Sequence, residues 1–272
     1  MFKIYSKHIF VLLVIVIAVL TNSCSEYSKL VKSSDYELKY TKAVEYYEAG
    51  AYYKAQALFE DLKGIYRATD KAQKVAYYNA YCSYGLGEYS LAAYLFKDFV
   101  RIYPSSEYAE EVSYIAAYCY YLISPEVSLE QTFTEAAISE LQFFVERYPN
   151  SEKRAEAEKN IDELQFKLET KAYNNAILYY NIMDYKAATT ALKNVLKDFP
   201  DTKYREDIMF TIMKADYLLA ENSIVEKQYE RYKNTIEDYY AFIDKFPNSK
   251  KIKEAEKIFT NSVKFIESKN GL

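Results

Sequence analysis

Residues 99–106 read Phe-Val-Arg-Ile-Tyr-Pro-Ser-Ser, and the same phrase returns three more times along the chain. It consists of two apolar residues, two mostly polar residues, an aromatic residue, proline, any residue, and then serine or threonine. The other copies are Phe-Val-Glu-Arg-Tyr-Pro-Asn-Ser at 144–151, Val-Leu-Lys-Asp-Phe-Pro-Asp-Thr at 195–202 and Phe-Ile-Asp-Lys-Phe-Pro-Asn-Ser at 242–249. A phrase that recurs every 45 to 51 residues is typical of a protein built from stacked repeats.

Each copy of the phrase predicts the end of one helix, a tight turn and the start of the next helix. The residue before a proline is driven out of the helical region, and proline itself cannot continue a helix. The serine or threonine two residues later can cap the following helix. Acidic residues follow directly in Ser106-Glu107 and Ser151-Glu152, where the positive end of the helix dipole favours them.

Residues 42–62 are similar to a tetratricopeptide repeat, which is a pair of antiparallel helices. In that repeat, small residues let helix A approach helix B, and here these positions hold Ala43 and Ala55. Gly50 falls at the turn between the two helices, and Phe59 is the large apolar residue that follows. The second repeat keeps this spacing with Ala80, Gly87, Ala92 and Phe96.

We therefore predict an all-α protein, a right-handed superhelical solenoid of about five tetratricopeptide-like helix pairs with a C-terminal capping helix. The expected repeats cover 36–69, 73–106, 107–150, 151–202 and 203–249, and the cap covers 250–268, all within a single domain at 36–268. Two positions depart from the pattern: Met183 stands where glycine is expected, and Arg67 stands where proline is expected. With only five glycines and five prolines in 272 residues, a strand-rich fold is disfavoured.

The N-terminus predicts a lipoprotein signal peptide over residues 1–23. Lys3 and Lys7 precede an apolar run at 9–20, which is too short to span a bilayer. The Thr-Asn-Ser-Cys ending at Cys24 resembles the bacterial lipobox, so Cys24 is the expected site of lipidation and 24–35 a lipidated tether. By resemblance to the enteric sorting rule, Ser25 favours the outer membrane. A plain signal peptide or a short membrane anchor is the alternative.

Composition disfavours several classes of function. The formal net charge of −4 argues against non-specific nucleic-acid binding. Removal of residues 1–23 also removes His8, the only histidine, which excludes histidine-dependent catalysis in the mature chain. We expect no enzyme, no metal and no cofactor, because no phosphate-binding or metal-binding motif is present. Cys82 and Cys119 occupy equivalent positions of neighbouring repeats, too far apart for a disulfide, and we expect both to be buried.

Tyrosine is unusually abundant, with 32 residues, and part of it lies in helix-A stripes. Residues three or four apart share one face of a helix, and the stripe of the second repeat returns 37 residues later in the third. In tetratricopeptide stacks these positions line a concave groove, so they predict a peptide-binding groove; packing within the core is the alternative. The candidate groove residues are Tyr40, Tyr47, Tyr77, Tyr81, Tyr84, Tyr114, Tyr118 and Tyr121.

A second resemblance rests mainly on residues 140–210. They contain Tyr-Pro-Asn-Ser at 148–151, a long charged helix, Tyr-Tyr at 179–180 and Asp-Phe-Pro-Asp-Thr at 198–202, in that order. Over about residues 36–266 the chain resembles the BamD, or YfiO-like, lipoproteins of the outer-membrane β-barrel assembly machine.

The resemblance implies a non-enzymatic scaffold that is lipid-anchored in the outer membrane and faces the periplasm. Its C-terminal repeats would hold the POTRA region of BamA, alongside other subunits of the machine, and its N-terminal groove would receive unfolded outer-membrane proteins. The expected BamA-docking region contains Tyr185, Lys193, Lys197 and Asp201.

Two other functions remain open at this point. A periplasmic tetratricopeptide lipoprotein could coordinate cell-envelope growth or motility through different protein partners. A glycan-binding lipoprotein of a nutrient uptake system is the other alternative, and the absence of tryptophan disfavours it because tryptophan usually supplies the surface on which sugars stack.

Overall fold

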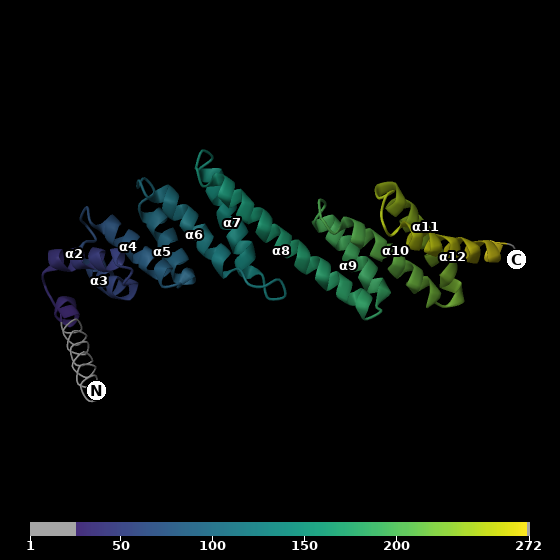
Figure 1. Ribbon diagram of the computed structural model, residues 1–272, viewed down its shortest axis with the longest axis horizontal. Coiled ribbons are helices and arrows are strands. Elements are labelled where there is room, and N and C mark those ends of the chain that lie inside the picture. The colour runs from purple at the N-terminus through teal and green to yellow at the C-terminus, as the bar shows by residue number, and fades with distance from the viewer. Residues whose placement is uncertain (1–25, 271–272) are drawn as a thin grey trace, which may run out of the picture. The chain divides into compact units, whose positions relative to one another are not determined.

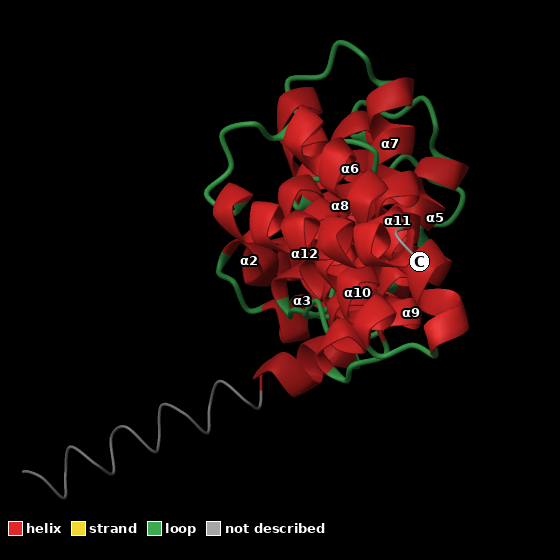
Figure 2. Cartoon of the chain, turned by 90° about the vertical axis from the view of Figure 1, so that its right-hand side faces the viewer, coloured by secondary structure: helices red, strands yellow, loops and turns green. Residues whose placement is uncertain are grey.

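The computed structural model describes residues 26–270, in which helices follow one another in antiparallel pairs (Figure 1). Between these two residues the structure has no strand (Figure 2). The pairs are α2 (Tyr36–Glu48) with α3 (Tyr52–Ile65), α4 (Ala72–Gly85) with α5 (Tyr89–Ile102), α6 (Ala109–Ile123) with α7 (Thr132–Arg147), α8 (Arg154–Asn181) with α9 (Tyr185–Asp198), and α10 (Arg205–Glu221) with α11 (Val225–Lys245). Helix α12 (Ile252–Asn270) follows the fifth pair. The predicted all-α class and its organisation in helix pairs are confirmed.

The described residues group into two compact units, and the single domain expected at 36–268 stays a prediction. The N-terminal unit contains the described residues up to Ser124 together with Thr132–Ile161. The C-terminal unit contains Pro125–Gln131 and the residues from Asp162 onward. Helix α8 therefore contributes its first residues to one unit and the rest to the other. It is one unbroken helix of 28 residues, as its lack of proline and glycine permits.

The core repeats with the helices. Small residues are fully buried where helix A crosses helix B, as in Ala43 with Ala55 and Ala80 with Ala92. Each B helix buries large side chains at equivalent positions: Phe59 and Leu62, Phe96 and Phe99, Leu141 and Phe144, Leu192 and Val195, and Phe242. Truncating one such aromatic side chain to alanine removes about 3–5 kcal/mol of stability, because the neighbouring helices cannot close the cavity.

The proline phrase ends each B helix in the same way. The N–H of Tyr103 donates the last helical hydrogen bond, to the Phe99 carbonyl, and Tyr103 then leaves the helical region at φ −122°, ψ 58°. The aromatic residue of every other copy donates the same bond, from Tyr148, Phe199 and Phe246. The first repeat does this without proline, since the Tyr66 N–H donates to the Leu62 carbonyl.

The serine or threonine of the phrase joins two consecutive A helices. Ser106 Oγ accepts the backbone N–H of Tyr108 at 3.0 Å, which shapes the turn into α6. The same oxygen accepts a hydrogen bond from the Gln73 amide on α4 at 2.6 Å. The hydroxyls of Thr202 and Ser249 repeat this arrangement and donate to Glu169 and Glu206.

A second contact accompanies each turn, and we call it the turn clamp. The residue two positions after the serine or threonine lies against an aromatic ring of the preceding A helix. Clamps occur in all five helix pairs: Lys71 on Tyr40 (4.8 Å), Tyr108 on Tyr77 (4.6 Å), Lys153 on Tyr114 (5.4 Å), Tyr204 on Tyr173 (4.3 Å) and Lys251 on Phe210 (5.3 Å). The distances run to the ring centroid from the lysine Nζ or from the second ring. Ring–ring and cation–ring contacts of this kind are worth about 0.5–1.5 kcal/mol each.

The turn from helix A to helix B requires a positive φ. Gly50 has φ 71°, and its N–H donates to the Tyr47 carbonyl, while the Ala51 N–H donates to the Tyr46 carbonyl. This pair of bonds is a Schellman motif, in which the left-handed residue is usually glycine. Gly87 and Met183 make the same two bonds at φ 77° and φ 65°. Met183 therefore holds the conformation that its place in the repeat predicts, although it carries a side chain.

The two cysteines are free and fully buried, as predicted. Cys82 lies on α4 and Cys119 at the equivalent position of α6. Burial raises the pKa of each thiol to about 12, so both stay protonated and unreactive at neutral pH.

Part of the expected tether belongs to the fold. Cys24 and the signal peptide lie outside the described residues, but residues 26–31 are helical. The Tyr27 hydroxyl donates to the Lys54 carbonyl at 3.1 Å, and the Tyr27 ring meets that of Tyr46 edge-on at 5.7 Å. The buried ammonium of Lys39 donates to the Val31 carbonyl at 2.9 Å. These bonds fasten the segment to the first helix pair.

The positive-φ turn generates a prediction about stability. Gly50→Ala should lower the free energy of unfolding by about 1–2 kcal/mol, because a Cβ disfavours the left-handed region. Met183→Gly should raise it by up to about 1 kcal/mol, since it relieves that strain at some cost in chain entropy. Urea titration followed by circular dichroism measures both. The control is Gly64→Ala within α3, where glycine weakens an ordinary helix and alanine should stabilise it. Equal effects of alanine at positions 50 and 64 would contradict the assignment.

Candidate protein-interaction surfaces

The eight candidate groove tyrosines all lie on A helices, namely α2, α4 and α6. Tyr114 is buried, with 3% of its surface exposed, and the other seven are half-buried. Tyr40, Tyr77 and Tyr114 hold the rings of three turn clamps, so they stabilise the stacking of the repeats. The tyrosine stripe was predicted to serve either peptide binding or core packing, and its positions differ in this respect. The first tyrosine of the stripe in each helix packs against the following turn.

Two tyrosines of α4 are joined to α6 through one carboxylate. The hydroxyls of Tyr77 and Tyr81 both donate to Glu111, at 3.1 Å for Tyr77. Burial raises the pKa of both phenols, and the Glu111 carboxylate raises it further. These side chains keep their protons at any physiological pH and act as fixed donors. The A-helix surface of the N-terminal unit is thus organised before any ligand arrives.

The remaining groove tyrosines form ring ladders with partly exposed edges. Tyr118 stacks on Tyr121 with ring centroids 5.4 Å apart and 12° between the planes, and Tyr114 stacks on Tyr118 at 5.9 Å. Tyr84 meets Tyr89 at 5.5 Å, and Tyr47 meets Tyr52 at 5.8 Å. Rigid, amphipathic rings of this kind suit peptide recognition, because they offer apolar area with little entropy to lose. Peptide binding itself stays a prediction.

The C-terminal unit carries an aromatic cluster that the sequence analysis missed. Tyr173 and Tyr180 lie on α8 at the positions equivalent to Tyr77 and Tyr84. The Tyr204 ring lies between Tyr173, at 4.3 Å, and Phe166, at 5.8 Å, with all three nearly parallel. Tyr173 and Tyr180 are seven residues apart, as are Tyr77 and Tyr84, and this spacing could have predicted the cluster. The many charged residues of α8 made the repeat pattern hard to recognise there.

The expected BamA-docking residues lie on α9 and the turn after it. Tyr185 begins α9 and packs against Tyr180 with ring centroids 5.8 Å apart. Lys193 and Lys197 are exposed and one helical turn apart, and Asp201 is exposed beyond Pro200. The Lys193 ammonium lies 3.9 Å from the Asp216 carboxylate. The four residues therefore do not form one contiguous cluster.

An exposed apolar edge in the C-terminal unit also escaped the sequence analysis. Ile182 and Met183 are 64% and 73% exposed at the α8–α9 turn, and Ile224 and Val225 are 63% and 61% exposed at the α10–α11 junction. Both turns lie at the lower edge of the C-terminal unit in Figure 1. Large apolar residues in turns, where polar residues are expected, make these two turns candidate contact points for a partner protein.

A carboxyl pair lies between α10 and α11 in the same unit. Asp216 is buried and accepts a hydrogen bond from the Thr189 hydroxyl at 2.9 Å. Burial raises the pKa of Asp238 to about 7, and the neighbouring Asp216 carboxylate contributes to that rise. Lys193 opposes the shift and Glu237 adds to it, but burial dominates.

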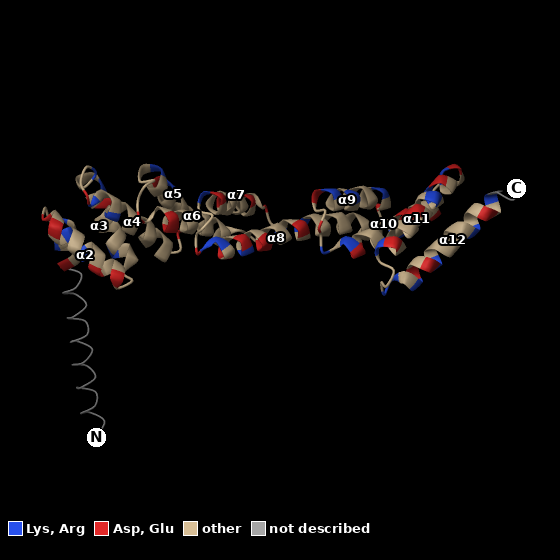
Figure 3. Cartoon of the chain, turned by 90° about the horizontal axis from the view of Figure 1, so that it is seen from above, with Lys and Arg blue, Asp and Glu red and all other residues tan. Residues whose placement is uncertain are grey.

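The described surface has no large patch of one charge. Basic and acidic side chains are interspersed over the helices of each unit (Figure 3). Among residues 26–270 no group of three or more histidine, cysteine, aspartate or glutamate side chains could hold a metal ion. None of the helices in that range combines the length and apolar character needed to cross a bilayer.

The architecture defines the class of protein: a helix-pair repeat protein whose exposed aromatic and apolar surfaces suit protein binding. The particular family follows from its sequence. A family model described as "YfiO: Outer membrane lipoprotein" matches residues 33–231, and the chain belongs to that family.

Among solved structures, the chain is similar to one described as "TPR2AB-domain:pHSP90-complex of yeast Sti1". The identity is 14% and the TM-score 0.38, covering 85% of this chain and 99% of the other. It is also similar to the TPR domain of P58(IPK), with 17% identity and a TM-score of 0.41, covering 87% of this chain and 68% of that one. No curated protein sequence matched.

The carboxyl pair predicts a pH dependence of stability. Because the pKa of Asp238 is about 7 in the fold and near 3.9 in an unfolded chain, the unfolded state releases its proton first as the pH rises. The stability contributed by this group should therefore be highest below about pH 4, fall as the pH rises from 4 to 7, and level off above 7. Relative to Asp238→Asn, which cannot titrate, the wild type should lose about 1–3 kcal/mol between pH 5 and 8. Urea titrations at each pH measure the difference, and parallel curves for the two proteins would contradict the assignment.

Proposed function

We propose that the protein is a non-enzymatic lipoprotein scaffold and receptor of the outer-membrane β-barrel assembly machine. Membership of the outer-membrane lipoprotein family over residues 33–231 is the observation that carries the proposal. Lipidation at Cys24 would anchor the chain in the outer membrane on its periplasmic side, since several acyl chains hold a protein stably. Cys24→Ala should then move the protein from the membrane to the soluble periplasmic fraction.

The N-terminal unit is the proposed receptor for unfolded outer-membrane proteins. Its half-buried tyrosines on α4 and α6 present ring edges and hydroxyls along consecutive A helices. The C-terminal segments of outer-membrane proteins are extended and apolar, and they usually end in an aromatic residue. Tyr118 and Tyr121, together with Tyr81 and Tyr84, would supply stacking faces to such a segment, while the clamp tyrosines keep the helices in place.

The C-terminal unit is the proposed docking site for the POTRA region of BamA. Support comes from the exposed apolar side chains Ile182, Met183, Ile224 and Val225, which lie in two turns where polar residues are expected. Tyr185, Lys193, Lys197 and Asp201 would lie at or beyond its rim, where charged side chains tune partner choice more than affinity.

The receptor role predicts the effect of removing two stacking rings. Tyr118→Ala with Tyr121→Ala should weaken binding of synthetic C-terminal peptides of outer-membrane proteins about fivefold to thirtyfold, the loss typical of interface aromatic anchors. Fluorescence anisotropy measures the affinity, and circular dichroism should show unchanged helicity. The matched control is Tyr53→Ala with Tyr94→Ala, which removes two rings that are 75% and 65% exposed on the B helices α3 and α5. If both double variants bind as the wild type does, the stripe serves packing alone.

The docking role predicts the effect of charge on the apolar edge. Ile182→Asp with Ile224→Asp should abolish co-purification of BamA from solubilised envelopes, because two buried carboxylates oppose an apolar contact. Both positions are exposed, so the fold should persist. Leu91→Asp with Tyr94→Asp, an equal change in the N-terminal unit, is the control and should retain BamA. Mass spectrometry identifies the partners. A cell-wall or transport protein as the main partner of the wild type would favour an envelope-coordinating role instead.

A further inference from the structure

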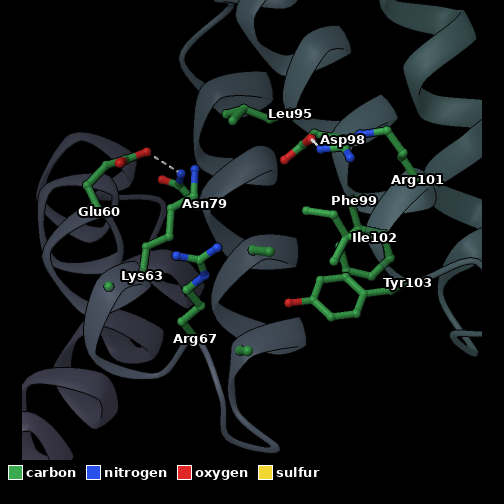
Figure 4. Close-up of a pocket in the computed structure, with 13 residues that line it drawn as sticks. Glu60, Lys63, Arg67, Asn79, Leu95, Asp98, Phe99, Arg101, Ile102 and Tyr103 are labelled. Carbon is green, nitrogen blue, oxygen red and sulfur yellow. Dashed lines mark hydrogen bonds and ion pairs between the residues drawn. The ribbon is translucent and has the colours of Figure 1, made fainter.

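A pocket of about 740 Å³ is lined by residues of α3, α4 and α5 (Figure 4). Helices α3 and α5 form its walls, and α4 forms its floor with Ala72, Ala76 and Asn79. These three residues recur at helical spacing, and at about 100° per residue they point some 140° away from Tyr77, Tyr81 and Tyr84. The pocket thus belongs to the B-helix face, which the proposed function does not use.

The pocket is deep because its floor and one wall are built from small residues. The short side chains of Ala72 and Ala76 on α4 leave the floor of the pocket unfilled. Leu95, Phe99 and Ile102 on α5 form an apolar wall. Gly64 stands at the edge of α3, and no atom lies within 4 Å of the place where its Cβ would be. A volume of this size admits one large apolar side chain and the backbone on either side of it.

One buried polar atom in the pocket is unsatisfied. Asn79 is 2% exposed, and its amide nitrogen donates to the Glu60 carboxylate, as the dashed line in Figure 4 marks. This bond fixes the amide orientation, so the carbonyl oxygen Oδ1 is the free end, and it has no partner. An unsatisfied buried acceptor costs about 1–3 kcal/mol, which a ligand N–H group would recover.

The charges at the pocket leave an excess of positive side chains. Arg101 forms an ion pair with Asp98, and Glu60 is bound by Asn79. Among the described residues, Lys63 and Arg67 have no ion-pair partner, and both line the pocket beside the turn that leads to α4. This end of the pocket therefore attracts a carboxylate.

Arg67 is one of the two departures from the repeat pattern, and the turn does not require it. The Thr69 N–H donates to the Tyr66 carbonyl, and the Thr69 hydroxyl accepts from the Lys71 N–H, as in the turns that contain proline. The first turn thus keeps its geometry, and the position of the proline is open to a side chain that reaches the pocket.

The equivalent groove of the next repeat is much smaller. Between α5 and α7 it measures about 200 Å³. There an ion pair between Lys97 and Glu140 spans the groove at the positions of Glu60 and Leu95, and Arg101 stands at the position of Gly64. Ala116 replaces Asn79. The open pocket is therefore a property of particular side chains and not of helix stacking.

The geometry points to a second peptide site: the pocket between α3 and α5 binds an extended segment of a partner protein in which a large apolar residue adjoins an acidic one. The apolar side chain packs on Leu95, Phe99 and Ile102, a backbone N–H donates to Asn79 Oδ1, and the carboxylate pairs with Lys63 and Arg67. A peptide fits better than a lipid, because a glycerophospholipid with saturated-carbon tails offers no N–H beside its apolar part.

A differential selection tests this site. A library of random 12-residue peptides displayed on phage is panned on the full-length protein in detergent, and binders that also recognise Gly64→Leu are discarded. Leucine at position 64 fills the pocket and favours the helix, so the fold should persist. Peptides bound only at the tyrosine groove recognise both proteins and are lost. We expect the retained peptides to share an apolar residue next to aspartate or glutamate.

Three variants then decide the matter on the retained peptides. Lys63→Glu with Arg67→Glu should weaken them at least about tenfold, as should Asn79→Ala, which installs the residue found at the equivalent position 116. Tyr118→Ala with Tyr121→Ala should leave them unchanged. The inference is overturned if no peptide distinguishes the wild type from Gly64→Leu, or if the retained peptides are not acidic. It is also overturned if the pocket-dependent ligand is instead a vesicle of phosphatidylglycerol.

Discussion

The turn clamp is the constraint on which the stacking of these helices depends. A proline turn decides only where one helix ends and the next begins. The clamp adds a contact between two consecutive A helices. The residue two positions beyond the serine or threonine must lie against the ring of Tyr40, Tyr77, Tyr114, Tyr173 or Phe210. Moving the turn by one residue would rotate that side chain by about 100° and break the contact. Local turn chemistry and the packing of consecutive A helices are in this way a single feature.

The clamp also explains how one aromatic stripe serves two purposes. The first tyrosine of the stripe in each helix packs against the residue of the following turn. At Tyr77, the hydroxyl also donates to Glu111, and Ser106 accepts hydrogen bonds from Gln73 and from the Tyr108 N–H. The later members, such as Tyr84 and Tyr121, are not the rings of the five turn clamps and are half-buried. The exposed face of the B helices contributes no ring to a turn clamp, so its side chains can differ between repeats. The large pocket at Asn79 and the smaller one at Ala116 differ for this reason.

The features that the sequence predicts correctly depend on interactions between residues in the same repeat or in neighbouring repeats. The helix pairs, the turn at each proline, the positive φ at Met183 and the buried cysteines all follow from spacing within one or two repeats. The pocket at Asn79 could not be predicted, because it combines three helices and depends on Gly64 and Leu95 leaving space. The acid pair of Asp216 and Asp238 was hidden among 39 acidic residues, since only burial distinguishes it. The outer-membrane assignment came from family resemblance, because helix spacing and turn chemistry by themselves carry no information about cellular location.

The short reach of the clamps has a consequence for how the protein folds. Each clamp joins residues only 31 to 41 positions apart, and the hydrogen bonds of the turns span similar distances. Such a chain has low contact order, so folding can nucleate in any helix pair and spread to its neighbours. Loss of one pair weakens the pairs beside it and leaves distant ones intact. Each unit therefore consists of coupled helix pairs that unfold from the unit's ends, and a protein bound to one pair protects that pair most, and its neighbours less, from hydrogen exchange and proteolysis.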